Sequence, residues 1–503
     1  MSAAPTLTIW VDGIGRSRAD VERVLRESVR QAAPGTEVVC LLAADEEYSE
    51  NWPVDAAVLL VPLPGDDAVS LNRLLSQTRT DWVVWIDASA NLAPGALGHV
   101  ETAVARFDID LLYGDSRLPG SQRTHRPAFS PIRLRSQDYL GDLRGFRVEA
   151  LRQSGGFGAG NAGAHPLDLS LRLGTDAARV LRIPEILSVS TAPIRPSTEQ
   201  HRRVVAEFLG ARDIVAEVTV AEVTVAAVAL RLNYPLTCTP LVSIIIPTRG
   251  SSATIRGAES VLVVDAVRGI LERSTYPSLE IVVVADDETP QSVIDALVCL
   301  AGDSLRLVRW SADFNFSAKM NRGAIFARGA YLVLLNDDVD LITPGWIEAM
   351  LGLAQQPGVG LVGSLLFFED GTVQHGGHVY SASWAGHIAF GWAADRDDDL
   401  GSLGVDREVS GVTAACAMIR ADTFWQLGGF SRDYAGNYND VDLSLKVRGS
   451  GLSVIWTPHA RLHHFESKTR IASVKPAELL TLRAHWGTRL LSDPYWSGSP
   501  EQS

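Results

Sequence analysis

The segment LVLLNDDVDLITPGWI, residues 332–347, contains the pattern that decides the fold. Its apolar start has the length of a buried β-strand, and the polar cluster Asn336-Asp337-Asp338 follows directly. Pro-Gly then opens a stretch with helical spacing. A strand that ends in polar residues and leads into a helix is typical of an α/β protein whose site lies at the strand ends.

The residues before this segment repeat the pattern. The runs 241–248, 279–287 and 331–338 are rich in aliphatic and β-branched residues and end in polar ones, and residues 258–271 have helical spacing. We therefore expect an α/β fold with a mostly parallel sheet, helices on both faces, and one cleft at the strand ends. The polar residues expected in that cleft are Thr248, Arg249, Asp286, Asp287, Asn336, Asp337 and Asp338.

A weaker copy of the same plan lies in the N-terminal half. VVWIDASANLAPGAL (83–97) resembles the opening segment, and SGGF (154–157) resembles LGGF (427–430). HPLDLSLRLG (165–174) likewise matches YNDVDLSLKVRG (438–449). Three matched elements in the same order indicate an internal duplication.

The duplication predicts two tandem domains of similar fold. We place them at residues 1–195 and 241–496, joined by a junction at 196–240 and followed by a disordered tail at 497–503. The repeat AEVTVAEVTV within the junction alternates polar and apolar residues and lacks Gly and Ser, so it predicts a strand and not a flexible linker.

Composition excludes several classes of protein. The net charge of −14 offers no basic face to nucleic acid, and 46% hydrophobic residues are normal for a globular protein. The four cysteines lie far apart without a CxxC pair, which favours a reducing compartment over a disulfide framework. Neither a signal peptide nor an apolar run long enough to span a membrane is expected, so we predict a cytoplasmic protein.

The adjacent carboxylates of Asp337 and Asp338 admit two interpretations. Burying unpaired charge is costly, so a hard divalent cation such as Mg²⁺ or Mn²⁺ could compensate it, with substrate phosphates completing the shell. Alternatively, the segment is a solvated turn with an aspartate that caps the next helix.

Two further clusters follow toward the C-terminus. In NDVDLSLKVRG we expect Asp442 to cap a helix, while Asp440 lies just outside it and could face the cleft as a general base. The pair His463 and His464 follows an apolar run, so one of them could be a ligand.

Two other segments carry polar groups that could line the site. In DGTVQHGGHVY, His375 and His378 form an HxxH pattern that could bind metal. Alternatively, the glycines predict a tight hairpin, and Gln374 and His375 could line a sugar or acceptor pocket. In RWSADFNFSAKMNRGA, Asn315 and Asn321 either support donor binding or serve as helix caps and core residues.

Nine motifs in one order resemble the inverting glycosyltransferases of family 2. The chain is most similar to tandem bacterial members that build rhamnose-containing or other surface polysaccharides, strongly over residues 240–496 and weakly over 80–190. The motifs are VSIIIPTRG, EIVVVADDE, FNFSAKMNRGA, LLNDDVD, DGTVQHGG, GVTAACAMIR, LGGF, NDVDLSLK and LHHFESKTR.

The resemblance implies a GT-A fold, a nucleotide-sugar donor and a divalent metal, Mg²⁺ or Mn²⁺. It implies that a hydroxyl of a glycan or lipid-linked glycan is the acceptor, and it allows peripheral contact with the inner face of the membrane. The donor would be held by Thr248, Arg249, Asp286, Asp287, Asn315, Asn321, Asn336 and Asp337. Asp338 with His463 or His464 would reach the metal, and Asp440 would be the catalytic base.

Two departures from the family pattern matter. The DxD motif begins with Asn336, and VADDE stands where the family has Asp-(Asn/Asp)-Gly-Ser, which leaves the choice between Asp286 and Asp287 open. Two other functions compete with glycosyl transfer: a non-catalytic glycan-binding or scaffold protein, and a sugar nucleotidyltransferase. The loop PTRGSSATIRG is a poor version of the glycine-rich loop that the latter needs.

The N-terminal copy lacks these functional groups. Asp87 stands alone in its metal-type cluster, Pro166 replaces the base, and Val189-Ser190 replace the histidine pair. We therefore predict a degenerate domain that kept the fold and lost the reaction. The alternative is a separate transfer reaction that uses other residues, for example Asp115 or His125.

Overall fold

The chain divides into two compact units. One comprises Met1–Leu232 with Asp397–Val405, and the other Asn233–Arg396 with Asp406–Ser503. The boundary at 232/233 falls inside the predicted junction, and the predicted tail lies outside the described residues. No helix among the described residues is long and apolar enough to cross a membrane. The computed structural model describes residues 4–43, 58–63, 68–118, 120, 123–161, 163–190, 198–221, 229–236, 238–382, 384–465 and 476–496.

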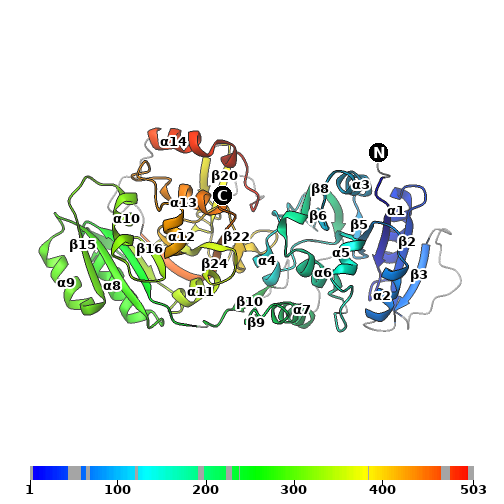
Figure 1. Ribbon diagram of the computed structural model, residues 1–503, viewed down its shortest axis with the longest axis horizontal. Helices are drawn as coiled ribbons and strands as arrows, with labels where there is room; N and C mark the ends of the chain where they lie inside the picture. The colour runs from blue at the N-terminus through cyan, green and yellow to red at the C-terminus, as the bar shows by residue number, and fades with distance from the viewer. Residues whose placement is uncertain are drawn as a thin grey trace. The chain divides into compact units, whose positions relative to one another are not determined.

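The first unit is built on an eight-stranded sheet of order β3-β2-β1-β4-β7-β6-β8-β5 (Figure 1). Its strands are β1 Leu7–Asp12, β2 Glu37–Ala43, β3 Val58–Leu63, β4 Trp82–Asp87, β5 Ala90–Leu92, β6 Leu111–Arg117, β7 Leu143–Arg147 and β8 Val180–Ser190. Its helices are α1 Arg18–Gln31, α2 Ala68–Gln77, α3 Ala96–Arg106, α4 Pro131–Ser136, α5 Val148–Gln153, α6 His165–Leu173 and α7 Thr198–Gly210. In the predicted junction, β9 Glu217–Val220 pairs with β10 Leu230–Asn233.

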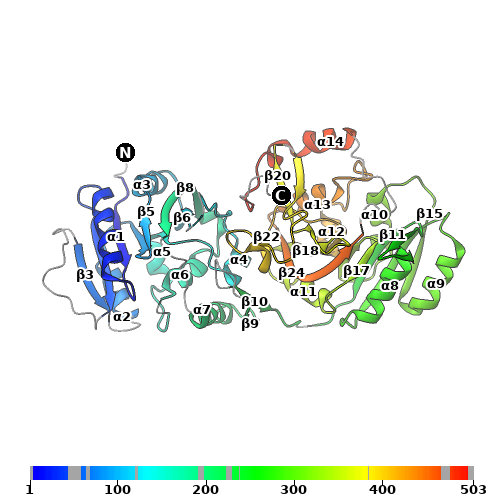
Figure 2. The same cartoon turned by 180° about the vertical axis from the view of Figure 1, so that it is seen from behind.

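The second unit has a ten-stranded sheet whose main path is β15-β14-β11-β16-β23-β18-β24-β17 (Figure 2). Those strands are β11 Val242–Thr248, β14 Leu279–Asp286, β15 Leu305–Trp310, β16 Tyr331–Leu335, β17 Val339–Leu341, β18 Val359–Phe367, β23 Cys416–Arg420 and β24 Ser453–His464. Off this path, β19 Val373–His375 pairs with β18, and β22 Arg407–Glu408 pairs with β24. Two separate hairpins are β12 Ser252–Ile255 with β13 Ala258–Val261, and β20 His378–Ser381 with β21 Trp384–His387.

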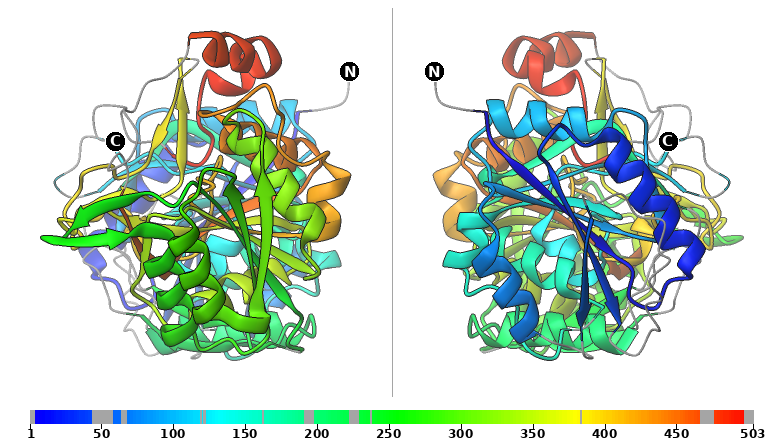
Figure 3. Two further views of the ribbon diagram at one scale, coloured as in Figure 1. Left: turned by 90° about the vertical axis from the view of Figure 1, so that its left-hand side faces the viewer. Right: turned by 90° about the vertical axis from the view of Figure 1, so that its right-hand side faces the viewer.

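Helices connect these strands and cover the sheet. They are α8 Leu262–Arg273, α9 Gln291–Ala301, α10 Phe316–Phe326, α11 Trp346–Ala354, α12 Ala421–Gln426, α13 Asn439–Gly449 and α14 Pro476–Trp486. Right-handed crossovers place α8 and α9 on one face and α10, which returns across the sheet to β16, on the other (Figure 3). Helix α14 contributes Leu482 to a buried cluster that also contains Leu490 and the α13 residues Val441 and Leu445.

The two sheets have the same strand order and the same strand directions. Position by position, β3-β2-β1-β4-β7-β6-β8-β5 corresponds to β15-β14-β11-β16-β23-β18-β24-β17. The registers also correspond, because Ala90 pairs with Ser190 in one sheet and Val339 pairs with His464 in the other. This agreement supports the internal duplication and aligns Asp87-Ala88-Ser89 with Asn336-Asp337-Asp338.

Two details of the fold differ from the prediction. Most strands on the main path run in one direction, as predicted, but the sheet is mixed, because β23 and β17 run antiparallel to their neighbours. An apolar run looks the same in either direction, so periodicity does not encode strand direction. Residues 258–261 form strand β13 instead of the start of the predicted helix, and α8 begins at Leu262.

Helix α10 lies close to the sheet because Gly323 has no side chain. A β-carbon at this position would lie 2.4 Å from Ile245 Cγ2 and 3.0 Å from Val284 Cγ2, both on buried strands. One turn earlier, Lys319 of the same helix is buried and reaches the carboxyl ends of those strands. The packing of one glycine therefore sets the position of a charged group.

We predict that Gly323→Ala destabilises the second unit by about 1–3 kcal/mol, because the added methyl overpacks the sheet. Gly269→Ala in α8 is the matched control, since only the flexible Arg273 side chain lies near that position. The control should be neutral or stabilising by up to about 1 kcal/mol. Urea unfolding of both variants measures the difference, and equal stabilities would contradict the proposed packing.

Candidate active site

The carboxyl ends of several strands line a cavity of about 670 Å³ in the second unit. Its lining includes the residues predicted from β11, β14, β16 and β24 and the first turn of α13. They are Thr248, Arg249, Asp286, Asn336, Asp337, Asp338, Asp440 and His464. Of the other predicted residues, Gln374 lines it, whereas Asp287, Asn315, Asn321, His375 and His463 do not.

Lys319 organises one side of the cavity. Its ammonium group donates to Asp286 Oδ1 at 2.6 Å and to the Thr248 carbonyl at 2.9 Å. The Lys319 side chain is buried, and the opposite charge of Asp286 compensates its charge. Of the two adjacent acids at the end of β14, Asp286 therefore faces the cavity and Asp287 does not.

Asn315 and Asn321 have structural bonds on either side of Lys319. Asn315 caps α10 by accepting from the Ala318 N–H at 2.8 Å, and it donates to the Arg432 carbonyl. Asn321 donates to the Phe430 carbonyl at 2.8 Å and accepts from the Phe430 N–H at 3.0 Å. These contacts match the alternative of helix caps and core residues, and they do not place either amide at the donor pocket.

The carboxylates after β16 are partly compensated by neighbouring donors. Thr248 Oγ1 donates to Asp337 Oδ2 at 2.5 Å. Burial, and then the charge of Asp338, raise the pKa of Asp337 from 3.8 to about 6, although Thr248 and Lys319 oppose the shift. Two like charges therefore share a partly desolvated space, which is the condition under which a bound cation is stabilised.

His464 completes this acidic end of the cavity. Its Nε2 lies 3.1 Å from Asp338 Oδ1 and 3.0 Å from Asn336 Nδ2. Its Nδ1 faces Gln374 Oε1 at 2.7 Å, so Nδ1 donates and Nε2 presents a lone pair. His463 precedes His464 in the strand, so its side chain points to the opposite side. Its Nδ1 contacts the Phe368 carbonyl at 2.9 Å.

This donor set fits a divalent cation. Two ligands bonded at about 2.1 Å and at right angles lie about 3 Å apart, and Asp338 Oδ1 and His464 Nε2 are separated by 3.1 Å. Gln374 fixes the imidazole from its other nitrogen, as the outer partners of metal-bound histidines do. One carboxylate and one imidazole leave room for phosphate oxygens and water.

Asp440 lies in the same cavity, in the first turn of α13. The Val441 N–H donates to Oδ1 at 2.8 Å, the Ala414 N–H lies 3.4 Å from Oδ2, and about a fifth of the side chain is exposed. Tyr438, the residue before the helix, has a φ of 61°, a left-handed conformation that a tyrosine adopts only under constraint. The carboxylate is therefore held by backbone donors and still accessible to a substrate.

The predicted cap at Asp442 was wrong, because α13 begins at Asn439 and Asp442 lies inside the helix. Its carboxylate accepts from Trp486 Nε1 at 2.9 Å and pairs with Lys446 at 2.8 Å. In the first unit Asp168 pairs in the same way with Arg172, at 2.7 Å. The aspartate common to both copies is thus structural, and Pro166 stands where the second copy has Asp440.

Sequence reasoning missed several residues of the cavity. Lys319, Trp384, His387 and Tyr438 all line it. Lys319 could have been noticed as one of four lysines in an arginine-rich chain, placed on the apolar face of a helix. The sequence gives no indication that the hairpin residues lie near Asp440, because that proximity depends on the tertiary placement of β20 and β21.

In the first unit, the corresponding positions have lost the ligand set. Asp87 pairs with Arg16 at 2.8 Å, and Ser190 stands where the second unit has His464. The alternative catalytic acid, Asp115, is fully buried and pairs with Arg123 and Arg182 at 2.8 Å each. His125 contacts the same carboxylate at 3.1 Å, so these residues form one internal ionic cluster.

Comparison with known proteins identifies relatives of most of the chain. The family described as Glycosyl transferase family 2 matches residues 243–428. O-antigen biosynthesis protein RfbC of Myxococcus xanthus is 32% identical over 440 residues, which are 83% of this chain and 33% of that protein. Uncharacterized protein y4gI of Sinorhizobium fredii is 29% identical over 453 residues, 85% of this chain and 49% of that protein. The chain thus spans half or less of these two relatives.

A third relative is similar to a smaller part of the chain. N-acetylglucosaminyl-diphospho-decaprenol L-rhamnosyltransferase of Mycobacterium tuberculosis is 27% identical over 201 residues, 35% of this chain and 63% of that protein. Among solved structures, GalNAc-T7 with UDP, GalNAc and Mn²⁺ covers 50% of this chain and 49% of its own, at 13% identity and a TM-score of 0.41. Mannosyltransferase PcManGT from Pyrobaculum calidifontis with GDP-Man and Mn²⁺ covers 50% and 70%, at 17% identity and a TM-score of 0.35. At these TM-scores neither likeness carries an argument about this chain.

The family match includes part of the residues that build the cavity. It begins at β11, includes the carboxylates after β16, and ends just after α12. The motifs from EIVVVADDE to GVTAACAMIR lie inside it in the same order, and VSIIIPTRG and LGGF overlap its two ends. NDVDLSLK and LHHFESKTR, with Asp440 and His464, lie beyond it. Residues 243–428 therefore form a glycosyl transferase family 2 domain.

Proposed function

We propose that the second unit is an inverting glycosyltransferase of GT-A type. It would move a sugar from a nucleotide-diphosphate donor to a hydroxyl of a glycan or lipid-linked glycan, in the synthesis of a cell-surface polysaccharide. The observation that carries the proposal is that Asp338 and His464, which fit a cation, share one cavity with the accessible carboxylate Asp440. The names of the O-antigen and rhamnosyltransferase relatives support the polysaccharide context.

The cavity residues would divide the work between donor and acceptor. Thr248, Asp286 and Lys319 would hold the nucleotide end of the donor, and the Lys319 charge would fix the Asp286 carboxylate. Asp338 and His464 would hold Mg²⁺ or Mn²⁺, which when bound stabilises negative charge on the departing diphosphate. Asn336 and Gln374 would keep the His464 ring in place.

Asp440 would act as the general base. Its carboxylate would take the proton from the acceptor hydroxyl as that oxygen attacks the anomeric carbon. The carbon–oxygen bond to the diphosphate breaks in the same displacement, and attack from the opposite side inverts the anomeric configuration. The two backbone N–H groups at the carboxylate would keep it oriented for this step.

We propose in addition that the first unit is a non-catalytic domain of the same fold. The aligned positions keep the strand order but have Ala88 and Ser89 in place of the two carboxylates, Pro166 in place of the base and Ser190 in place of the histidine. Its buried Asp115 cluster is engaged in internal ion pairs, which argues against a second reaction centre there. Such a domain would bind acceptor glycan or another protein chain, at a cytoplasmic or peripheral membrane location.

We predict that Asp440→Asn lowers sugar transfer about 10²–10⁴-fold, the usual contribution of a general base. Release of nucleoside diphosphate from a panel of nucleotide sugars with Mn²⁺ and mixed glycan acceptors measures the rate. Thermal shift with the same donors should be unchanged, because the amide keeps the shape of the carboxylate.

Asp433→Asn is the matched control, since Asp433 is exposed, lies seven residues earlier and does not line the cavity. The control should keep normal turnover. Near-normal transfer by the Asp440 variant would show that another group is the base. Absence of turnover by the wild type with every donor would contradict the glycosyltransferase proposal itself.

We predict that Asp337→Asn stabilises the metal-free protein. The pKa of Asp337 is raised from 3.8 to about 6 in the folded state. The folded protein therefore loses stability as the pH rises from about 4 to about 6, and the loss remains at higher pH. Removing the charge should therefore increase the free energy of unfolding by about 1–3 kcal/mol at pH 7.5, and by less at pH 5.

Urea unfolding in EDTA at both pH values measures this effect. Asp370→Asn serves as the control, because Asp370 is exposed and the Thr372 hydroxyl and N–H lower its pKa, so its loss should not stabilise the fold. A metal-free wild type more stable than the Asp337 variant at pH 7.5 would contradict the assigned desolvation.

A further inference from the structure

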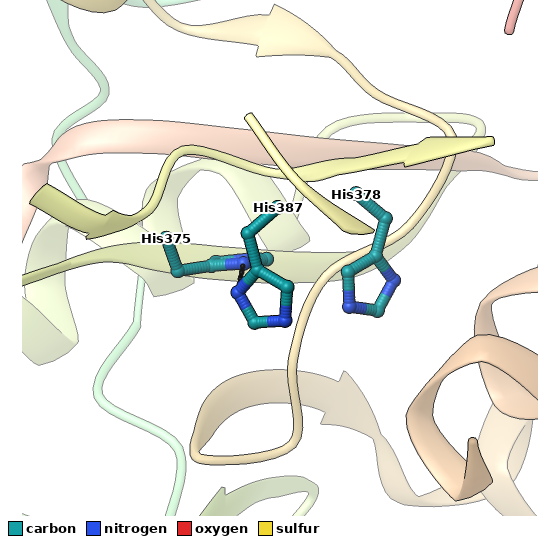
Figure 4. A group of neighbouring side chains, drawn as sticks. All are labelled: His375, His378 and His387. Carbon is teal, nitrogen blue, oxygen red and sulfur yellow. Dashed lines mark hydrogen bonds between the residues drawn. The ribbon is translucent and has the colours of Figure 1, made fainter. Parts of the chain in front are cut away.

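The hairpin β20–β21 brings three imidazoles together beside Asp440. His378 and His387 are directly paired across the hairpin, and His375 precedes it (Figure 4). The ring centroids are 4.7 to 5.3 Å apart, and one nitrogen of each ring lies within 4.8 Å of the others. His378 and His387 line the cavity, and His378 Nε2 lies 3.8 Å from Asp440 Oδ2.

A cation site is the first explanation to test, and the hydrogen bonds of His375 oppose it. The Thr413 N–H donates to His375 Nε2 at 3.2 Å, so this nitrogen is engaged as an acceptor. The neutral ring must then carry its proton on Nδ1, which lies 3.0 Å from His387 Nδ1 (Figure 4). Neither nitrogen of His375 therefore presents a lone pair to a metal.

The same bonds fix the tautomer of His387. His375 Nδ1–H donates to His387 Nδ1, so the neutral His387 ring carries its proton on Nε2. Burial and the neighbouring imidazoles lower the pKa of His375 well below 6.5, which keeps that ring neutral. The chain of bonds ends at a backbone amide, which cannot accept a proton, so it orients a donor and does not relay protons.

An aromatic side chain accompanies this donor on the hairpin. Trp384 lines the cavity and is 46% exposed. Its indole lies over Gly386, where an added β-carbon would be only 1.9 Å from the ring. A half-exposed indole can pack against the apolar face of a sugar ring while neighbouring polar groups bind the hydroxyls of that ring.

We propose that the β20–β21 hairpin is the acceptor subsite and that it takes a sugar. Trp384 covers one face of the acceptor sugar, and His387, fixed as an Nε2–H donor by Thr413 and His375, binds a hydroxyl oxygen near Asp440. The acceptor hydroxyl accepts a hydrogen bond within this subsite and offers its own proton to the carboxylate. This inference rests on the proposed function and deepens it.

The first test reads the tautomers without any substrate. Long-range ¹H–¹⁵N spectra of the full chain labelled with ¹⁵N-histidine, assigned with His375→Gln and His387→Gln, should show protons on Nδ1 of His375 and on Nε2 of His387 at pH 7.5. A proton on Nδ1 of His387 would overturn the proposal. So would a tetrahedral Co²⁺ absorption band, formed without nucleotide and lost in His375→Ala, because it would make the cluster a metal site.

The second test measures sugar binding with methyl α-L-rhamnoside and methyl N-acetyl-β-D-glucosaminide as probes. We expect saturation-transfer signals from at least one glycoside with the wild type, and about a tenfold weaker affinity in Trp384→Ala. Trp425→Ala is the matched control, since Trp425 is 45% exposed and does not line the cavity. Binding equal in both variants, or no glycoside binding by the wild type, would overturn the sugar assignment.

A kinetic test separates this inference from the proposed function. His387→Phe and His375→Phe should raise the acceptor KM about tenfold and leave the donor KM unchanged, and His387→Gln, which keeps an N–H donor, should recover part of the loss. Unchanged acceptor KM in an enzyme that still transfers sugar would overturn the acceptor subsite alone. Failure of the wild type to turn over any nucleotide sugar would overturn the proposed function, while the tautomer and glycoside results would still stand.

Discussion

Two neighbouring carboxylates at the end of β16 set the constraint on which the second unit depends. Asp337 and Asp338 are held where water is partly excluded, so each adjoining element must supply a compensating group. β11 supplies the Thr248 hydroxyl and β24 supplies His464, and α10 brings Lys319 to the same strand ends. The proposed cation and diphosphate would relieve this repulsion, which would couple stability to the proposed function.

The short strand β19 joins the two sides of the cavity. Gln374 and His375 are consecutive, so their side chains leave the strand in opposite directions. Gln374 fixes the ring of His464 beside Asp338, and His375 fixes the ring of His387 on the hairpin. Gln374 and His375 thus orient His464 toward the proposed cation site and His387 toward the proposed acceptor subsite. Any shift of β19 would disturb both sides together.

Comparison of the two units distinguishes the residues that build the fold from those assigned to the proposed reaction. It has the same strand order without the paired carboxylates, so those charges do not build the sheet. Both units keep an ion pair between residues one helical turn apart. It joins Asp168 to Arg172 in α6 and Asp442 to Lys446 in α13. These residues produced the most visible sequence similarity between the halves, yet they stabilise helices. The difference that bears on the proposed reaction lies two residues earlier, at Pro166 and Asp440.

The sequence by itself determined the α/β class, the polar strand ends and the contrast between the halves. Hydrophobic periodicity and the residues that follow it are local properties, so the cavity positions of Thr248, Asp338 and Asp440 could be predicted from the residues alone, whereas the choice between Asp286 and Asp287 stayed open. The order of the motifs also indicated the family that residues 243–428 match.

The tertiary structure decided everything that depends on direction, face or distance along the chain. It showed that β23 and β17 run antiparallel, that His464 and not His463 faces the cavity, and that Asp442 is structural. It also brought the hairpin imidazoles to Asp440 from a distant part of the chain. Periodicity specifies which side chains share a face, whereas the pairing of distant strands decides what that face meets.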